Sequence, residues 1–213
     1  IANGKPVLVN SAGTVTQISE TAQTIGSEAV FESATSDWIN ATFDSNSNKV
    51  VIGYGDGGNS GYGTAVVATI DSSDNSVSYG TPVVFVSGEV RYLSTTFDSN
   101  TNRVVMSYRN DTSSDNGFSV VGSVSGTGIS FGTPVTFNSG GSSTNYVAST
   151  FDSSNNKVVI AYQDGNNSSY GTAIVGTVDS SDNSISFGSE AVFESAGIQH
   201  TAITFDSSNN KVV

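Results

Sequence analysis

A ten-residue motif recurs four times along this chain at constant spacing. Its first copy is TFDSNSNKVV at residues 42–51, and the later copies begin at Thr96, Thr150 and Thr204. The second residue is always phenylalanine, and successive copies are 54 residues apart: Phe43, Phe97, Phe151 and Phe205. A fixed period near 50 residues is typical of repeat architectures, so this spacing constrains the fold more than any single motif does.

Each repeat divides into four strand-like runs rich in β-branched and aromatic residues. In the first repeat these runs are Trp38–Phe43, Lys49–Tyr54, Thr64–Ile70 and Val77–Phe85. The second run is apolar on both faces, which favours a central strand. The fourth contains Pro82, which cannot donate to a ladder and so favours an edge strand. Turn-forming residues separate the runs, and we expect Phe43 and its equivalents to fill the contact between neighbouring sheets.

Four short strands in each repeat of this length are typical of a β-propeller blade. A β-solenoid has shorter coils, and an immunoglobulin-type array needs about 100 residues per domain. We therefore predict an all-β chain: a β-propeller built from 54-residue four-stranded blades that form an incomplete ring.

The repeats are expected to occupy residues 25–213. We predict a partial blade at 25–37, full units at about 38–91, 92–145 and 146–199, and a partial unit at 200–213. The first piece, Ile25–Phe31, is expected to be a fourth strand, and the chain ends within a second strand. Since propellers usually close with more blades, we expect the natural protein to continue, with six to eight blades in the ring.

Residues 1–24 precede the repeats and are predicted to form a small β-hairpin and a linker. Pro6–Asn10 and Thr14–Ile18 are strand-like, and the three-residue loop between them ends at Gly13. Such loops usually need a left-handed residue at that position, and glycine supplies it. Ser19–Thr24 is polar and is expected to be the linker.

Composition excludes several classes of function. The formal net charge is −12 with only seven Lys and Arg, so the chain would repel a phosphate backbone, and we expect no nucleic-acid partner. No apolar run approaches the roughly 18–20 residues that cross a bilayer, so we expect no membrane insertion. Cysteine is absent, which removes disulfides and thiolate metal sites. No cofactor is expected.

The Asp-Ser-x-x-Asn segment of the motif has two interpretations. Asp44, Asn46 and Asn48 place oxygen ligands at alternate positions, as at the start of a calcium loop, but the usual glycine and bidentate glutamate are missing. We favour an Asx-type hairpin turn, with Asp44 capping local N–H groups. The cation after each turn (Lys49, Arg103, Lys157 and Lys211) is expected to pair with the aspartate of its own unit.

Catalysis has little support in the sequence, and we predict that the chain is not an enzyme. His200 is the only histidine, and no Ser/His/Asp set can be built around it. The Ser-x-Asp-x-Gly-x-Thr-Trp box of sialidase-type propellers is absent.

The positions that break the repeat are the candidate ligand-binding residues. One set lies at the start of each first strand: Trp38, Arg91, Tyr92, Asn145, Tyr146, Gln199 and His200. A second set follows the inner tyrosines Tyr54, Tyr108 and Tyr162: Asp56, Arg109, Asp111, Gln163 and Asp164. In a four-stranded meander both sets emerge on the same face, opposite the Asp turns. This face suits recognition of a carbohydrate or a protein, but the aromatic residues would equally suit packing between blades.

The segment Phe151–Phe193 resembles repeats that are abundant in marine, cyanophage-like phage tail and virion proteins, and Ala2–Val15 is similar to the hairpin that precedes such repeats. The resemblance implies a non-enzymatic virion appendage, such as a tail fibre, that is extracellular and recognises a host surface. Its implied partners are other virion proteins and a host cell-surface glycan or protein, with a possible homo-oligomer. Two alternatives are a bacterial extracellular filament or adhesion protein whose repeats serve assembly, and a propeller enzyme that acts on polysaccharide.

Overall fold

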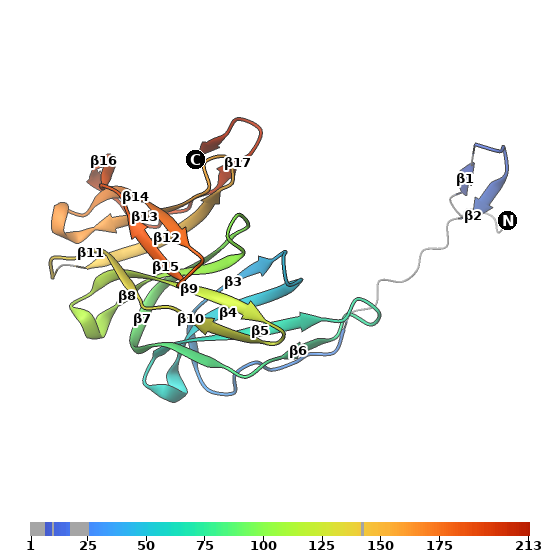
Figure 1. The fold of residues 1–213 in the computed structure, drawn as a ribbon, viewed down its shortest axis with the longest axis horizontal. Coiled ribbons are helices and arrows are strands. Elements are labelled where there is room, and N and C mark those ends of the chain that lie inside the picture. The colour runs from blue at the N-terminus through green and yellow to red at the C-terminus, as the bar shows by residue number, and fades with distance from the viewer. Residues whose placement is uncertain (1–6, 10, 18–25, 142) are drawn as a thin grey trace.

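A computed structural model describes residues 7–9, 11–17, 26–141 and 143–213 (Figure 1). The fold is all-β, and its strands pair antiparallel throughout the described sheets. The N-terminal hairpin consists of β1 (Val7–Val9) and β2 (Val15–Gln17), which pair only with each other. Gly13 in their loop has a φ of 75°, as the sequence predicted. Pro6, Asn10, Ile18 and the linker Ser19–Thr24 lie outside the described residues.

The first repeat forms β3 (Ser36–Asp44), β4 (Lys49–Asp56), β5 (Tyr62–Ile70) and β6 (Val77–Tyr79). A short 3₁₀ turn, η1 (Gly57–Asn59), joins β4 to β5. β4 pairs with both β3 and β5, so the run that is apolar on both faces is a central strand, as predicted.

The later repeats follow the same plan. β7 (Val83–Asp98) is one continuous strand that ends the first repeat and begins the second. The second repeat continues with β8 (Arg103–Asn110), η2 (Asp111–Ser113), β9 (Asn116–Ser125), β10 (Gly128–Phe131) and β11 (Val135–Asn138). The third has β12 (Thr144–Asp152), β13 (Lys157–Asp164), η3 (Gly165–Asn167), β14 (Tyr170–Asp179), β15 (Ser184–Phe187) and β16 (Ala191–Gly197). The last strands are β17 (Phe205–Asp206) and β18 (Lys211–Val212).

Two predicted strands differ from the structure. The run Val77–Phe85 is interrupted at residues 80–82, so that β6 and the start of β7 pair separately with β5. Pro82 lies in this gap, where it has no ladder bond to donate. The predicted strand Ile25–Phe31 is irregular in its described part, residues 26–31. The equivalent segments, the start of β7 and β16, pair with the third strand of their own repeat, β5 and β14. Residues 26–31 have no such third strand beside them among the described residues.

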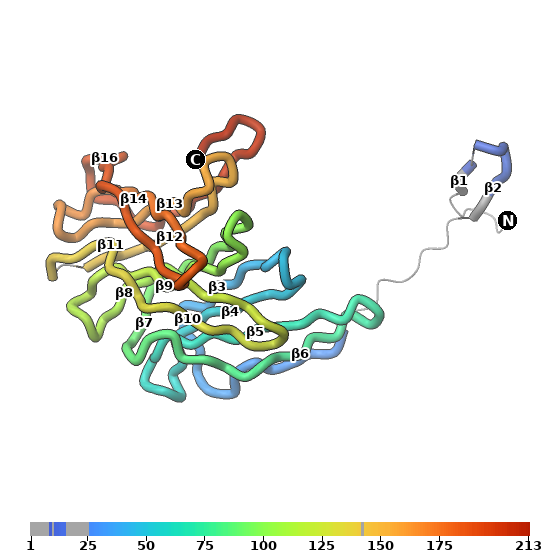
Figure 2. The backbone as a smooth tube through the Cα atoms, viewed as in Figure 1, coloured from blue at the N-terminus to red at the C-terminus, as the bar shows by residue number. Residues whose placement is uncertain are grey.

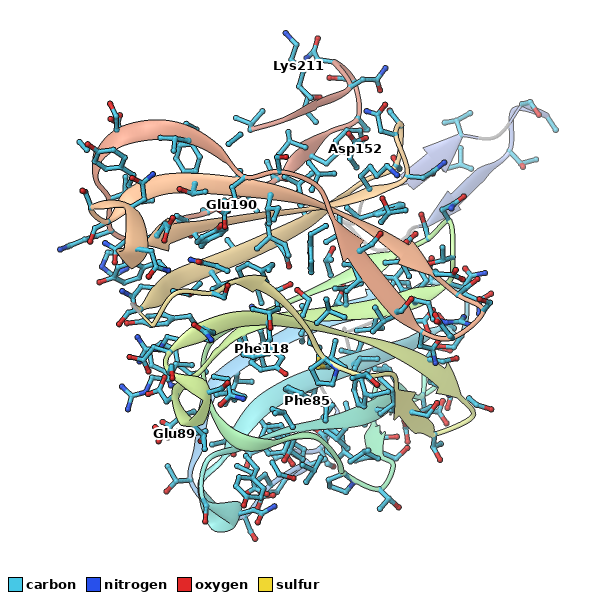
Figure 3. All side chains as sticks on the ribbon, turned by 60° about the vertical axis from the view of Figure 1, so that its left-hand side comes forward. Phe85, Glu89, Phe118, Asp152, Glu190 and Lys211 are labelled. Carbon is cyan, nitrogen blue, oxygen red and sulfur yellow. The ribbon has the colours of Figure 1, made fainter. Side chains whose placement is uncertain are left out.

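The core lies between successive repeats and is built from equivalent residues each time. Phe85, which lies at the end of one repeat (Figure 3), packs on Tyr108 of the next with ring centroids 5.3 Å apart. Phe137 and Tyr162 repeat this contact at 5.2 Å. The first ring pair belongs to one cluster of buried apolar side chains and the second pair belongs to another. The two clusters lie on either side of the second repeat. Burial of this apolar surface is the main stabilising term of the fold.

Phe43 departs from the expected packing. Phe97 packs against the first cluster and Phe151 against the second, but Phe43 is 53% exposed. The prediction was wrong for this copy because the ring needs the preceding repeat as a partner, and no described repeat precedes the first one.

The first strands of successive repeats lie beside one another, with β3 and β12 both against β7 (Figure 2). Side chains of one first strand bond to the backbone of the next. Asn40 Oδ1 accepts hydrogen bonds from the Thr95 N–H at 2.9 Å and the Thr95 hydroxyl at 2.6 Å. The Ser149 N–H donates to Ser94 Oγ at 2.9 Å. The fold therefore brings equivalent positions of neighbouring repeats close together.

The Asp-Ser-x-x-Asn segments are Asx-type turns, as predicted. Asp44 Oδ1 accepts hydrogen bonds from the N–H groups of Asn46 and Ser47 at 2.9 and 3.1 Å. The same contacts recur at Asp98, Asp152 and Asp206. In the described part of the chain, no group of three or more His, Cys, Asp or Glu side chains could hold a metal ion. The calcium candidates Asp44, Asn46 and Asn48 have a single carboxylate among them, and its Oδ1 accepts the hydrogen bonds of the turn.

The predicted ion pairs beside these turns do not form among the described residues. The salt bridges of the structure all involve Arg91 or Arg109. Arg103 donates instead to Asn183 Oδ1 at 2.6 Å and to the Ser180 carbonyl, and Lys157 donates to the Thr177 hydroxyl at 2.7 Å. The aspartate oxygens already accept hydrogen bonds within their turns, and Arg103 and Lys157 bind neutral oxygens elsewhere. No helix in the described residues is long and apolar enough to cross a membrane.

Candidate functional site

Four aromatic residues occupy the same unusual backbone position in successive repeats. Trp38, Tyr92, Tyr146 and His200 have φ values of 53°, 51°, 51° and 60°. For a bulky residue this left-handed conformation costs about 1–3 kcal/mol. The first three lie where the register between the first and second strands shifts. Bulges of this kind re-aim a side chain, so each repeat turns one aromatic ring away from its regular strand direction.

The four rings form a continuous row, called here the aromatic row. Trp38 and Tyr92 have ring centroids 4.6 Å apart, Tyr92 and Tyr146 are 5.1 Å apart, and Tyr146 and His200 are 4.8 Å apart. Tilted contacts at these distances are favourable for aromatic pairs. Trp38 is 40% exposed, His200 is exposed, and the two tyrosines are partly buried. The row therefore has packing contacts along its length and an accessible surface as well.

The residue before each aromatic ring faces the residue after an inner tyrosine across the strand pair. Arg91 lies opposite Arg109, and Asn145 lies opposite Gln163. Asp37 and Gly55 have the same relation in the first repeat. The structure thus brings the two sequence-predicted sets together at one end of the strands.

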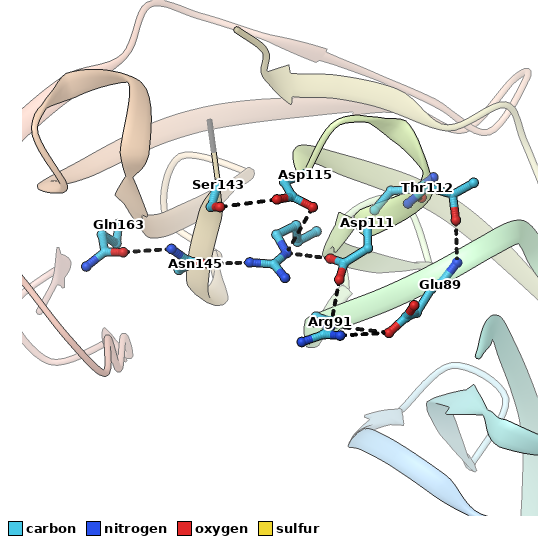
Figure 4. Close-up of polar contacts among 10 residues, drawn as sticks. Glu89, Arg91, Asp111, Thr112, Asp115, Ser143, Asn145 and Gln163 are labelled. Carbon is cyan, nitrogen blue, oxygen red and sulfur yellow. Dashed lines mark hydrogen bonds and ion pairs between the residues drawn. The ribbon is translucent and has the colours of Figure 1, made fainter. Parts of the chain in front are cut away.

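These polar residues are linked in a network (Figure 4). Arg91 Nε contacts Asp111 Oδ2 at 2.6 Å, and its Nη2 donates to Glu89 at 3.0 Å. Arg109 Nε donates to Asp111 Oδ1 at 2.6 Å. The bond to Glu89, and then the charge of Asp111, raise the pKa of Arg91.

The network continues into the third repeat through neutral amides. Arg109 Nη1 donates to Asn145 Oδ1 at 2.5 Å, and Asn145 Nδ2 donates to Gln163 Oε1 at 2.8 Å. Gln163 Nε2 in turn donates to the Ile198 carbonyl. The Arg109 guanidinium also lies 5.2 Å from the centroid of the Tyr92 ring, a cation–π contact. The network and the aromatic row are therefore one surface.

The remaining predicted residues divide into two groups. Gln199 and His200 line a cavity of about 280 Å³ with Phe193, Ile198 and Thr201. Asp164 is buried and caps η3: it accepts from the Asn166 N–H at 2.9 Å and from Asn138 Nδ2 at 3.1 Å. Asp56 holds the equivalent place before η1 without a side-chain capping bond. Asp164 is therefore a structural residue, whereas Gln199 and His200 border open space.

Sequence reasoning missed two members of the network, Glu89 and Asp115. Asp115 lies 4.0 Å from Arg109 and accepts a hydrogen bond from Ser143. Both residues also break the repeat, because the equivalent positions of the preceding unit, 54 residues earlier, are Thr35 for Glu89 and Gly61 for Asp115. A wider search for non-repeating positions would have found both.

No protein-family model matches the chain, and no curated protein sequence matches it. The fold is similar to that of a mutant of the NanB sialidase from Streptococcus pneumoniae, with 15% identity and a TM-score of 0.53 over 77% of this chain. It is also similar to an exo-β-1,3-galactanase from Phanerochaete chrysosporium, solved with β-1,3-galactotriose, with 12% identity and a TM-score of 0.50 over 95% of this chain. This chain spans 25% of the sialidase and 44% of the galactanase.

These neighbours contradict the expectation of a non-enzymatic phage-tail appendage. Both are enzymes that act on carbohydrates and neither is a virion protein, so they agree better with the alternative of a propeller enzyme that acts on polysaccharide. That the chain is not an enzyme stays a prediction.

Proposed function

We propose that this chain is part of a polysaccharide-directed β-propeller in which the aromatic row and the adjoining polar network bind a glycan. Sugar rings have apolar C–H faces and hydroxyl rims, so a binding surface for them combines aromatic side chains with hydrogen-bonding groups. The row from Trp38 to His200 supplies the aromatic side chains, and Asn145 with the partly exposed carboxylates of Glu89 and Asp115 supplies the hydrogen-bonding groups.

The observation that carries this proposal is the repeated left-handed backbone of the aromatic row. Packing between strands does not require a strained aromatic residue, because an ordinary strand position would bury the ring without the cost. The same conformation is nevertheless found at Trp38, Tyr92 and Tyr146, next to side chains that vary from repeat to repeat. Strain that recurs at one surface is typical of functional sites.

The proposal is tested by binding of polysaccharides to the chain and to two single-residue variants. In affinity electrophoresis through gels that contain soluble galactans, glucans or mannans, we expect retardation of the wild type by at least one polymer. Trp38→Ala removes the largest ring of the row, which is 40% exposed, and is expected to weaken that retardation about tenfold, the loss typical of a key interface aromatic.

Phe43→Ala is the matched control, since Phe43 is an exposed aromatic residue outside the row. Equal retardation of the wild type and both variants would place binding elsewhere. Absence of retardation in all gels would contradict the proposed function. Far-UV circular dichroism of each variant checks that the fold is retained.

Glycoside hydrolysis at the same face is a second candidate, supported by the likeness to two carbohydrate-acting enzymes and by the carboxylates of Asp111 and Asp115 beside the row. Hydrolysis needs an acid and a base or nucleophile at one site. Release of reducing sugar from a bound polysaccharide, abolished in Asp115→Asn, would support it, and release that is unchanged in both Asp115→Asn and Asp111→Asn would not.

A further inference from the structure

We propose that the polar network selects uncharged glycans and disfavours those that carry carboxylate or sulfate groups. This inference rests on the proposed glycan binding and names the class of glycan. It concerns the two arginines of the site, which would be the natural receptors for an anionic sugar.

The Asp111 carboxylate bridges the guanidiniums of Arg91 and Arg109. Its Oδ2 lies 2.6 Å from Arg91 Nε, and its Oδ1 lies 2.6 Å from Arg109 Nε. Charge-assisted bonds of this length are strong, and an anion that approached either guanidinium would have to compete with a carboxylate already in place.

The outer ends of the two guanidiniums are engaged as well. Arg91 Nη2 donates to Glu89 Oε1 at 3.0 Å, and Arg109 Nη1 donates to Asn145 Oδ1 at 2.5 Å. The Arg109 side chain is only 10% exposed and lies over the Tyr92 ring. A bidentate contact with a ligand carboxylate needs a free, parallel pair of N–H groups, and these bonds leave Arg109 poorly placed to offer one.

The charge around the network also opposes an anion. Three carboxylates, on Glu89, Asp111 and Asp115, surround the guanidiniums of Arg91 and Arg109. The other described cations (Lys49, Arg103, Lys157 and Lys211) follow the Asp turns at the opposite end of the strands. The whole chain has a net charge of −12. A negatively charged sugar would therefore meet like charges at this surface, which favours its rejection.

An uncharged sugar meets the opposite situation. A hydroxyl group both donates and accepts, so it can donate to the partly exposed carboxylates of Glu89 or Asp115 and accept from the second N–H of the partly buried Asn145 amide, whose first N–H is bonded to Gln163. It can do this without breaking the arginine–aspartate bonds.

The test compares an uncharged β-1,3-galactan with its chemically sulfated form, by isothermal titration calorimetry of the full chain at low ionic strength, where charge effects are largest. We expect the wild type to bind the sulfated form at least about tenfold more weakly than the uncharged form. Asp111→Asn removes the charged bridge between the two guanidiniums and is expected to remove most of that difference in affinity.

Asp115→Asn is the matched control, because it makes the same charge change but leaves Asp111 between the arginines. It is expected to reduce the difference in affinity between the uncharged and the sulfated galactan much less than Asp111→Asn does. If the two variants behave alike, net charge alone sets the preference and the proposed role of the Asp111 bridge is wrong.

Two further outcomes separate this inference from the function on which it rests. Equal or tighter binding of the sulfated form by the wild type would overturn the selectivity and leave glycan binding intact. Binding of neither form, in a protein that also fails to bind the wider polysaccharide panel, would overturn the proposed function and this inference with it.

Discussion

Of two buried tyrosines at equivalent positions, one has a hydrogen-bonded hydroxyl and the other does not. This difference predicts that removal of the hydroxyl changes the stability of the fold in opposite directions at the two positions. Tyr108 and Tyr162 are both fully buried, and each packs on a phenylalanine of the preceding repeat. The Tyr162 hydroxyl donates to Glu190 at 2.7 Å. The Tyr108 hydroxyl is buried and has no hydrogen-bond partner among the described residues. Burial raises the pKa of both, so both hydroxyls stay protonated.

Replacement by phenylalanine removes only the hydroxyl and keeps the ring. Tyr162→Phe loses one hydrogen bond to a carboxylate, but Glu190 is exposed and can return to water, so we expect a loss of about 1 kcal/mol. Tyr108→Phe removes a buried polar group that gains nothing from the fold, so we expect a gain of about 1 kcal/mol.

The assay is thermal and urea unfolding followed by far-UV circular dichroism. In a chain of this size each variant should shift the melting temperature by about 2–4 °C, downward for Tyr162→Phe and upward for Tyr108→Phe. Glu190→Gln keeps a neutral acceptor and should cost less than Tyr162→Phe. If Tyr108→Phe destabilises the chain as much as Tyr162→Phe, the Tyr108 hydroxyl has a partner and the reasoning is refuted.

Three other predictions concern the repeats. Gly117→Ala places a methyl group 2.5 Å from the Phe137 ring and should cost about 1–3 kcal/mol in urea unfolding, whereas Gly188→Ala, whose nearest atom lies at 3.8 Å, should cost less; equal costs would contradict the packing argument. Asn40→Ala leaves the Thr95 N–H without its acceptor and should speed hydrogen exchange at Thr95 more than at Val105; uniform exchange would argue against this link between repeats. Hydrogen bonds from Asn209 and Ser208 lower the pKa of Asp206 to about 2, so the stabilising contribution of this carboxylate is fully present above the ordinary pKa of 3.8 and is lost as the pH falls through about 2. The Asp206 carboxyl carbon should titrate near pH 2 by NMR, and a midpoint near 4 would contradict the assignment.

The strands and turns could be predicted from the sequence because their causes are local. Consecutive β-branched residues make Lys49–Tyr54 apolar on both faces, which predicts its central position, and the Asp44 side chain forms its turn with residues two and three positions later. The break at residues 80–82 was less evident, because Pro82 indicated an edge strand without indicating that the strand would divide there.

Features that depend on neighbouring repeats could not be predicted in the same way. Phe43 and Phe97 stand in the same local sequence, yet only Phe97 has a repeat in front of it to bury its ring. Arg103 binds Asn183 in a turn 80 residues away rather than the aspartate five residues before it. Spacing alone says nothing about such contacts.

The candidate site was partly predictable, because its residues break the repeat. The sequence placed Arg91 next to Tyr92 and Arg109 after Tyr108, but not the shared contact with Asp111. Nor does any local pattern predict the left-handed backbone of Tyr92, since tyrosine has little intrinsic preference for it.

The central claim, that the aromatic row binds a glycan, can be tested through Trp38 itself, because it is the only tryptophan in the chain. Its fluorescence reports on the row and on no other surface. Titration of the wild type with an uncharged β-1,3-galacto-oligosaccharide, with acrylamide as a quencher, should give a saturable change in Trp38 emission and protection from quenching. Tyr92→Ala should weaken the response about tenfold and Phe43→Ala should leave it unchanged. Saturable binding by calorimetry with no change in Trp38 emission would contradict the claim, and so would failure to bind both this oligosaccharide and the galactans, glucans and mannans of the gel assay.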